Sequence, residues 1–156
     1  MLLPTLLGLL LLAQAPDGAA LERFFVGRTE GQGMVHIALS GRHGVRDRGR
    51  GRIDTDGALV LDQVVMEEGK PARRRSWRLV RSGANGISGT ISDARGPVTG
   101  EVSGNVVHLR YRSMEGPYVE QRITLHPDGR TASNRMIFRR FGLSVATVET
   151  AIRRVD

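Results

Sequence analysis

The feature that most constrains the fold is a two-residue alternation of apolar and polar side chains, interrupted by turn signals at short intervals. Between residues 105 and 113, for example, Val107, Leu109 and Tyr111 alternate with polar side chains. Because successive side chains of a strand point to opposite faces, this spacing places an apolar face opposite a polar one. Such a pattern is typical of antiparallel sheets that cover a core on one side.

Glycine-rich turns separate the alternating segments, and their Asp-Gly and Gly-Asn pairs tolerate the positive φ of tight hairpins. We therefore predict an all-β chain with about ten short strands after one short helix at residues 21–25. A single antiparallel up-and-down barrel would remove the two edges of such a sheet, and an open sandwich is the alternative. The strands are expected at residues 33–40, 45–53, 58–67, 73–82, 86–92, 98–102, 105–113, 117–125, 132–140 and 144–154.

The start of the chain has the features of an export signal. Residues 2–13 are almost wholly apolar, which is too short a run to span a bilayer but the right length for a secretory signal. Small-x-small motifs end at Ala15 and at Ala20, and we favour Ala20 because a cut after Ala15 would place Pro16 next to the cleavage site. We therefore expect a signal peptide over residues 1–20 and a single barrel domain over residues 21–156. A buried N-terminal helix is the alternative. No later apolar run is long enough to predict a membrane helix.

The composition argues against several chemistries. The chain has no cysteine, which excludes disulfides, thiolate catalysis and cysteine zinc sites. Its four histidines lack the spacing of metal ligands, and it has neither a nucleophile elbow nor a phosphate-binding loop. We therefore expect no catalytic residues, no metal and no cofactor. The predicted protein is not an enzyme; a hydrolase or isomerase acting on a lipid-like substrate is the alternative that the sequence leaves open.

The composition is strongly basic, with 23 Lys and Arg against 16 Asp and Glu. Arginines cluster at residues 46–52 and 73–78, and adjacent strands would gather them on one positive face. One interpretation is a surface for anionic envelope lipids, rather than for nucleic acid. The other is that arginine merely serves as a solvated surface residue. The candidate residues for an anionic-surface patch are Arg73, Arg74, Arg75 and Arg78.

Three groups of residues follow one another along the chain. They are Leu21–Gly27 with Gly31–Val35; Gly89, Thr90, Asp93, Gly96, Pro97, Gly100, Glu101, Gly104 and Asn105; and Asn134, Arg135, Arg140, Phe141, Gly142, Val145 and Val148. In this order they resemble the bacterial family called domain of unknown function 3833. The resemblance implies a small envelope protein with a lipocalin-like barrel and no established activity. Members often carry a lipidated cysteine after the signal; since this chain has none, we expect a periplasmic protein without a lipid anchor.

Polar residues within an apolar face mark the candidate binding site. On the strand expected at 132–140, Asn134, Phe138 and Arg140 share a face. A buried polar group without a partner costs about 1–3 kcal/mol, so these groups must be hydrogen-bonded or face a ligand. Glu120 is a candidate partner, and a purely structural salt bridge is the other interpretation. The candidate ligand-binding residues are Trp77, Tyr111, Glu120, Asn134, Arg135, Phe138 and Arg140.

Two functions follow from these predictions. The first is a non-catalytic binder or carrier of a small amphiphilic or lipid-like ligand, held inside an exported periplasmic barrel. The second is a structural or interaction protein of the anionic cell envelope, with a filled barrel and no ligand. An open apolar cavity favours the first function, whereas a filled interior favours the second.

Overall fold

A computed structural model describes residues 19–156 of the chain. The predicted export signal at residues 1–20 therefore lies, except for its last two residues, outside the described residues. The described part holds one short helix followed by ten strands. These are α1 (Ala20–Phe25), β1 (Gly27–Ile37), β2 (Gly41–Ile53), β3 (Leu59–Glu67), β4 (Arg73–Ser82), β5 (Gly86–Ile91), β6 (Ala94–Ser103), β7 (Val106–Ser113), β8 (Tyr118–Leu125), β9 (Thr131–Arg140) and β10 (Leu143–Arg154).

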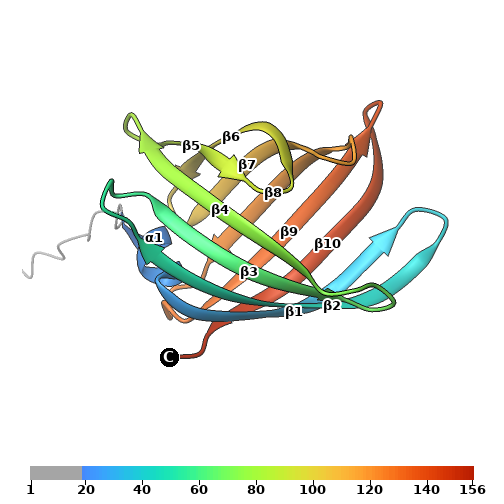
Figure 1. Cartoon of the computed structure of the whole chain (residues 1–156), viewed down its shortest axis with the longest axis horizontal. Helices are drawn as coiled ribbons and strands as arrows, with labels where there is room; N and C mark the ends of the chain where they lie inside the picture. Colours follow the sequence, from blue (N-terminus) through green and yellow to red (C-terminus); the bar gives the residue numbers. More distant parts are fainter. Residues whose placement is uncertain (1–18) are drawn as a thin grey trace, which may run out of the picture.

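The strands form a closed antiparallel barrel (Figure 1). Each strand pairs with its neighbours in sequence, and β1 pairs with β10 from Thr29↔Arg154 to Ile37↔Ala146 to close the sheet. The prediction of an all-β up-and-down barrel is confirmed, and the sandwich alternative is wrong. Closure satisfies the backbone donors and acceptors that the first and last strands would otherwise leave exposed.

Three strands begin earlier than predicted. β1 starts at Gly27, β2 at Gly41 and β6 at Ala94, because backbone pairing continues through glycine- and arginine-rich stretches that carry no apolar alternation. In β6 the ladder shifts register between Arg95 and Thr99. Pro97, which has no N–H to donate, lies within this irregularity.

Helix α1 covers one end of the barrel, which we call the closed end (Figure 1). Leu21, Phe24 and Phe25 are buried, and the two phenylalanine rings pack edge-to-face with centroids 4.9 Å apart. A helix of six residues is unstable by itself, so this packing is what holds it. No helix among residues 19–156 is long and apolar enough to cross a membrane.

The opposite end, which we call the open end, carries the β1–β2, β3–β4, β5–β6, β7–β8 and β9–β10 turns. Inward-facing side chains alternate with outward-facing ones along the strands, as predicted. The most tightly packed core residues, among them Val107 and Leu109, lie toward the closed end. Buried apolar side chains are therefore concentrated in the half of the barrel next to α1, where they also form the apolar floor of a cavity that opens at the other end.

Candidate functional site

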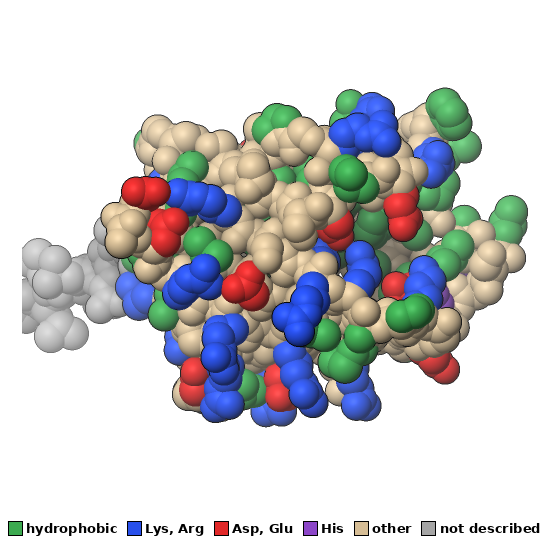
Figure 2. All heavy atoms as spheres, viewed as in Figure 1, with side chains coloured by type: hydrophobic (Ala, Val, Ile, Leu, Met, Phe, Trp, Pro, Cys, Tyr) green, Lys and Arg blue, Asp and Glu red, His purple; other side chains and the backbone are tan. Residues whose placement is uncertain are grey.

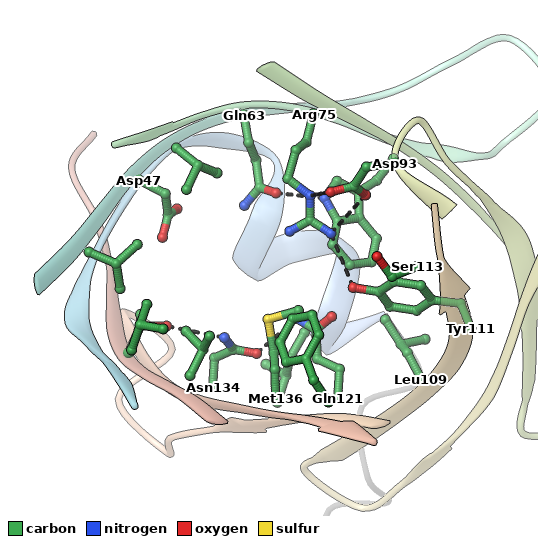
Figure 3. Close-up of a pocket in the computed structure, with 18 of the residues that line it drawn as sticks. Asp47, Gln63, Arg75, Asp93, Leu109, Tyr111, Ser113, Gln121, Asn134 and Met136 are labelled. Atoms are coloured by element: carbon green, nitrogen blue, oxygen red, sulfur yellow. Dashed lines mark hydrogen bonds and ion pairs between the residues drawn. The ribbon is translucent and has the colours of Figure 1, made fainter. Parts of the chain in front are cut away.

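A cavity of about 520 Å³ extends from α1 to the open end of the barrel. Its deep part is apolar, and its walls become polar and then charged toward the open end. β4 shows this gradient, because its inward side chains read Leu79, Trp77, Arg75 and Arg73 from the closed end outward. Figure 3 shows polar side chains reaching the lumen from opposite walls. A volume of this size is within the range of small-molecule sites.

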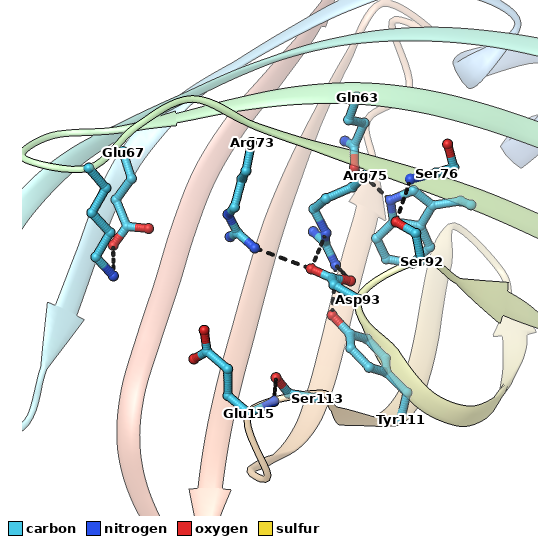
Figure 4. Close-up of polar contacts among 12 residues, drawn as sticks. Gln63, Glu67, Arg73, Arg75, Ser76, Ser92, Asp93, Tyr111, Ser113 and Glu115 are labelled. Atoms are coloured by element: carbon cyan, nitrogen blue, oxygen red, sulfur yellow. Dashed lines mark hydrogen bonds and ion pairs between the residues drawn. The ribbon is translucent and has the colours of Figure 1, made fainter.

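The most buried charged residue in the cavity is Arg75, which is 7% exposed. Its Nε lies 2.7 Å from Oδ2 of Asp93, and its Nη2 donates to Asp93 Oδ1 and to the Tyr111 hydroxyl, both at 3.1 Å (Figure 4). The guanidinium also lies 4.9 Å from the centre of the Trp77 ring, a cation–π distance. Four residues from β4, β7 and the β5–β6 turn thus hold one buried ion pair.

Electrostatics in this cluster favour a charged Arg75 guanidinium and a neutral Tyr111 phenol. Burial alone would lower the pKa of Arg75, but Tyr111 and Asp93 outweigh it and raise that pKa. Burial raises the pKa of Tyr111 above its usual value. Arg73 reaches the same Asp93 carboxylate at 3.2 Å. Two arginines therefore share one carboxylate, so this group of three side chains has a net positive charge, while the cavity lining also includes Asp47, Glu67 and Glu115.

A second polar group lies across the lumen. Gln121 Nε2 donates to Asn134 Oδ1 at 2.8 Å, and Asn134 Nδ2 donates to Thr150 Oγ1 at 3.1 Å. Gln121 Oε1, although buried, has no hydrogen-bond partner among the described residues. On the first wall, Trp77 Nε1 donates to Gln63 Oε1 at 2.6 Å. A ligand hydroxyl or amide N–H would complete the hydrogen bonding of Gln121.

Asp47 adds a carboxyl group that points into the lumen from β2 (Figure 3). Its cross-strand neighbour Gly31 makes room for it, because a Cβ at Gly31 would lie 2.1 Å from Asp47 Oδ2. Burial raises the pKa of Asp47, and the charge of Arg75 partly offsets that rise. No hydrogen bond or ion pair joins this carboxyl to another residue of the described chain.

Charged residues surround the cavity mouth. Glu67 lies 2.5 Å from the His43 ring nitrogen and 3.3 Å from Lys70 Nζ. Burial would raise the pKa of Glu67, but hydrogen bonds from His43 and Lys70 hold it below its usual value. On the other side of the mouth, Arg140 Nη2 donates to the Glu115 carbonyl at 2.7 Å.

Comparison with known proteins places the chain in a family. The model for the protein family of unknown function DUF3833 matches residues 12–154. The chain belongs to this family. Among solved structures, the S-type phycobiliprotein lyase CPES from Guillardia theta is similar, with a TM-score of 0.68 and 12% identity, over 87% of this chain and 92% of that one. At this identity the likeness shows a shared lipocalin-like fold alone. No curated protein sequence matches the chain.

Most residues predicted to bind a ligand lie where this DUF3833 protein has its cavity. Trp77, Tyr111, Asn134, Phe138 and Arg140 all line it. They were found because their positions share the parity of the apolar residues on the same strands. Whether they contact a ligand stays a prediction.

Two predicted ligand-binding residues face the other way. Glu120 points outward and lies 3.5 Å from Arg139, so it is not the partner of the inward-facing Asn134. Arg135 is exposed and lies 3.4 Å from Glu149. Both positions have the parity of the outer face, which excludes them from the cavity.

The predicted anionic-surface patch is divided between the two faces of the barrel. Arg75 is buried, and Arg73 lines the cavity, so neither belongs to the outer wall. Arg78 is outside but pairs with Asp54 at 3.3 Å and Asp56 at 3.0 Å. A run of consecutive arginines on a strand must alternate between faces, and this alternation splits the cluster.

A different set of arginines does gather on the outer wall, over β2 and β4 (Figure 2). Arg48 and Arg74 flank Val64 across three strands, and no ion pair joins either of them to a described residue. Arg46 and Arg50 continue the row along β2. The sequence cluster at 46–52 indicated this set, and strand pairing brings Arg74 beside it.

Sequence reasoning missed two kinds of cavity residue, namely polar residues on strands and one residue in a turn. Asp47, Gln63 and Gln121 have inward parity, but polar inward residues were not separated from ordinary breaks in the alternation. Asp93 lies in a turn, where parity has no meaning. Its role depends on how the β5–β6 turn folds back over the open end.

Proposed function

We propose that the protein binds a small amphiphilic, lipid-like molecule inside the barrel and acts as an exported periplasmic carrier rather than an enzyme. The observation that carries this proposal is the cavity of about 520 Å³, with an apolar floor and a charged mouth. The hypothesis of an interaction protein required a filled barrel, so the cavity favours the carrier. A buried apolar surface with a few convergent polar groups is the usual form of a small-molecule site.

The gradient of the walls sets the orientation of the ligand. The apolar portion would lie toward Leu61, Leu109 and α1, where burial of apolar surface contributes about 25 cal/mol per Å². The polar end would lie near Arg73, because two arginines share the carboxylate of Asp93 and leave a net positive charge. This charge favours an anionic head group.

A matched pair of neighbouring arginines tests the proposal. Arg73 lines the cavity mouth, whereas Arg74 lies on the outer wall and has the same charge. A fatty-acid probe is titrated into the protein while the fluorescence of Trp77, the single tryptophan, is followed. We expect saturable quenching, about threefold to tenfold weaker binding for Arg73→Ser, and no change for Arg74→Ser.

The corresponding fatty alcohol is the second control, because it keeps the apolar chain and lacks the charge. It should bind the wild type and Arg73→Ser equally. Absence of saturable quenching with either probe would show that the cavity is not a binding site for such molecules. Equal effects of the two arginine substitutions would show that the charge acts from a distance rather than at the mouth.

A further inference from the structure

Apolar side chains protrude from the open end of the barrel. Leu39, at the tip of the β1–β2 hairpin, is 107% exposed, and Phe141, at the tip of the β9–β10 hairpin, is 101% exposed. Leu143, the first residue of β10, and Met114, in the β7–β8 turn, lie at the same end and are also exposed. Figure 2 shows hydrophobic side chains at both hairpin tips, on the right of the view. Single exposed apolar residues are ordinary, but these four surround one opening.

The backbone at both tips makes an apolar residue a poor choice for folding. Leu39 has φ 66° and Phe141 has φ 50°, and no other non-glycine residue among 19–156 has a positive φ. Phe141 and Gly142 form a two-residue hairpin loop in which both φ values are positive, where asparagine followed by glycine is favoured. Neither core packing nor turn preference explains an apolar side chain at these two positions. We therefore infer that the side chains contact a surface other than this protein itself.

The two tips are neighbours in space and adjoin the cavity. β1 pairs with both β2 and β10, and the Ala38 N–H donates to the Val145 carbonyl at 3.0 Å, which ties the two hairpins together. Val145 and Arg140, beside the second tip, line the cavity mouth. Any surface that receives Leu39 and Phe141 therefore lies against the opening of the cavity.

The charge at this end is positive. Residues 38–44, 66–73, 92–95, 112–118 and 139–145 contain seven Lys and Arg against four Asp and Glu. Arg42, next to the first tip, has no ion pair with a described residue. Protruding apolar side chains among cations fit an anionic bilayer, where apolar groups enter the acyl region and cations contact phosphates. A protein partner would require a continuous apolar patch, which separate tips around an opening do not supply.

We propose that the open end of the barrel docks on an anionic lipid bilayer, with Leu39 and Phe141 inserted among the acyl chains and the cationic side chains of the mouth on the head groups. Docking in this orientation places the cavity mouth against the membrane. The inference goes beyond the proposed function and does not rest on it, because the exposed tips and the charge would act whether or not the cavity holds a ligand.

Vesicle sedimentation with the full chain tests the docking surface. Phosphatidylcholine vesicles with and without phosphatidylglycerol are compared, and all variants keep the same N-terminus. We expect Leu39→Ser/Phe141→Ser to bind phosphatidylglycerol vesicles about tenfold or more weakly than the wild type. The matched control is Ile53→Ser, which removes an apolar residue that is 45% exposed at the closed end and should change nothing.

A local probe reports the orientation independently of the N-terminal segment. The chain has no cysteine, so an environment-sensitive dye on Ser40→Cys labels the first tip alone. The dye should shift to the blue with phosphatidylglycerol vesicles, and the same dye on Ile53→Cys should not. High salt should weaken binding, because head-group contacts are screened.

Phe141→Asn separates docking from folding, because asparagine suits this turn. The variant should be more stable to heat than the wild type and still lose vesicle binding. The proposal is overturned if the tip variants bind as the wild type does, or if the two dyes shift equally. It is also overturned if the tip variants still bind vesicles while Arg48→Ser/Arg74→Ser does not, since the outer wall would then be the docking face.

Discussion

The buried pair of Arg75 and Asp93 yields a quantitative prediction about stability. The Arg75 side chain is 8% exposed, while that of Asp93 is 32% exposed and is also contacted by Arg73. Asp93→Asn therefore leaves a deeply buried cation without its counter-charge. Arg75→Met instead leaves Asp93 paired and reachable by water, and it fills the site with an apolar side chain of similar length. The two substitutions should thus differ although they remove the same ion pair.

The magnitudes follow from these exposures. Removing one partner of a fully buried pair costs about 3–5 kcal/mol. Because Asp93 is partly exposed, we expect about 3 kcal/mol for Asp93→Asn and about 1 kcal/mol for Arg75→Met. The double variant should resemble Arg75→Met, which gives a coupling free energy of about 3 kcal/mol in magnitude. A domain of this size has about 5–15 kcal/mol of stability, so every variant should still fold.

Urea unfolding followed by the fluorescence of Trp77 measures the cycle, because that ring lies beside the guanidinium. A loss of 3 kcal/mol lowers the midpoint by about 1–2 M. The reasoning is refuted if Asp93→Asn costs less than Arg75→Met. It is refuted equally if the two single effects add in the double variant.

Three further predictions concern other parts of the barrel. Phe141→Asn should raise the free energy of unfolding by about 1 kcal/mol and the melting temperature by roughly 3–5 °C, because asparagine tolerates the left-handed conformation; an unchanged melting temperature would contradict this. Burial raises the pKa of Asp47 above 3.8, so the stability of the wild type should fall as pH rises from that value through the raised pKa. Asp47→Asn should then be more stable than the wild type at neutral pH and equal to it in acid, whereas parallel pH profiles would exclude the effect. Gly33→Ala should cost about 2–3 kcal/mol, since its Cβ would lie 1.8 Å from the Glu149 carbonyl oxygen, while the neighbouring exposed Gln32→Ala should cost less than about 0.5 kcal/mol in the same urea assay.

Local patterns in the sequence were enough to predict the class and order of the elements. Apolar alternation predicted all ten strands, although β1 begins six residues, and β2 and β6 four residues, earlier than expected. Its parity placed Trp77, Tyr111, Asn134 and Phe138 on the inner face. The same parity, applied strictly, would have excluded Arg135 and Glu120 from the cavity. The position of a strand and the face of each side chain can be predicted from sequence, because side chains alternate between the two faces from one residue to the next.

Closure of the barrel determined the cavity, the buried ion pair and the surface at the open end. Whether ten strands enclose a filled core or a hollow depends on the sum of side-chain volumes around the whole ring, which no single segment records. Arg75 on β4 forms an ion pair with Asp93 in a turn and donates a hydrogen bond to Tyr111 on β7, and these residues meet when the sheet curls and the turn folds over the open end. The exposed tips of the open end likewise become one surface because β1 pairs with β10. Volume and long-range proximity arise from the way distant segments pack, and this is why they appear in the tertiary structure and not in the pattern of residues.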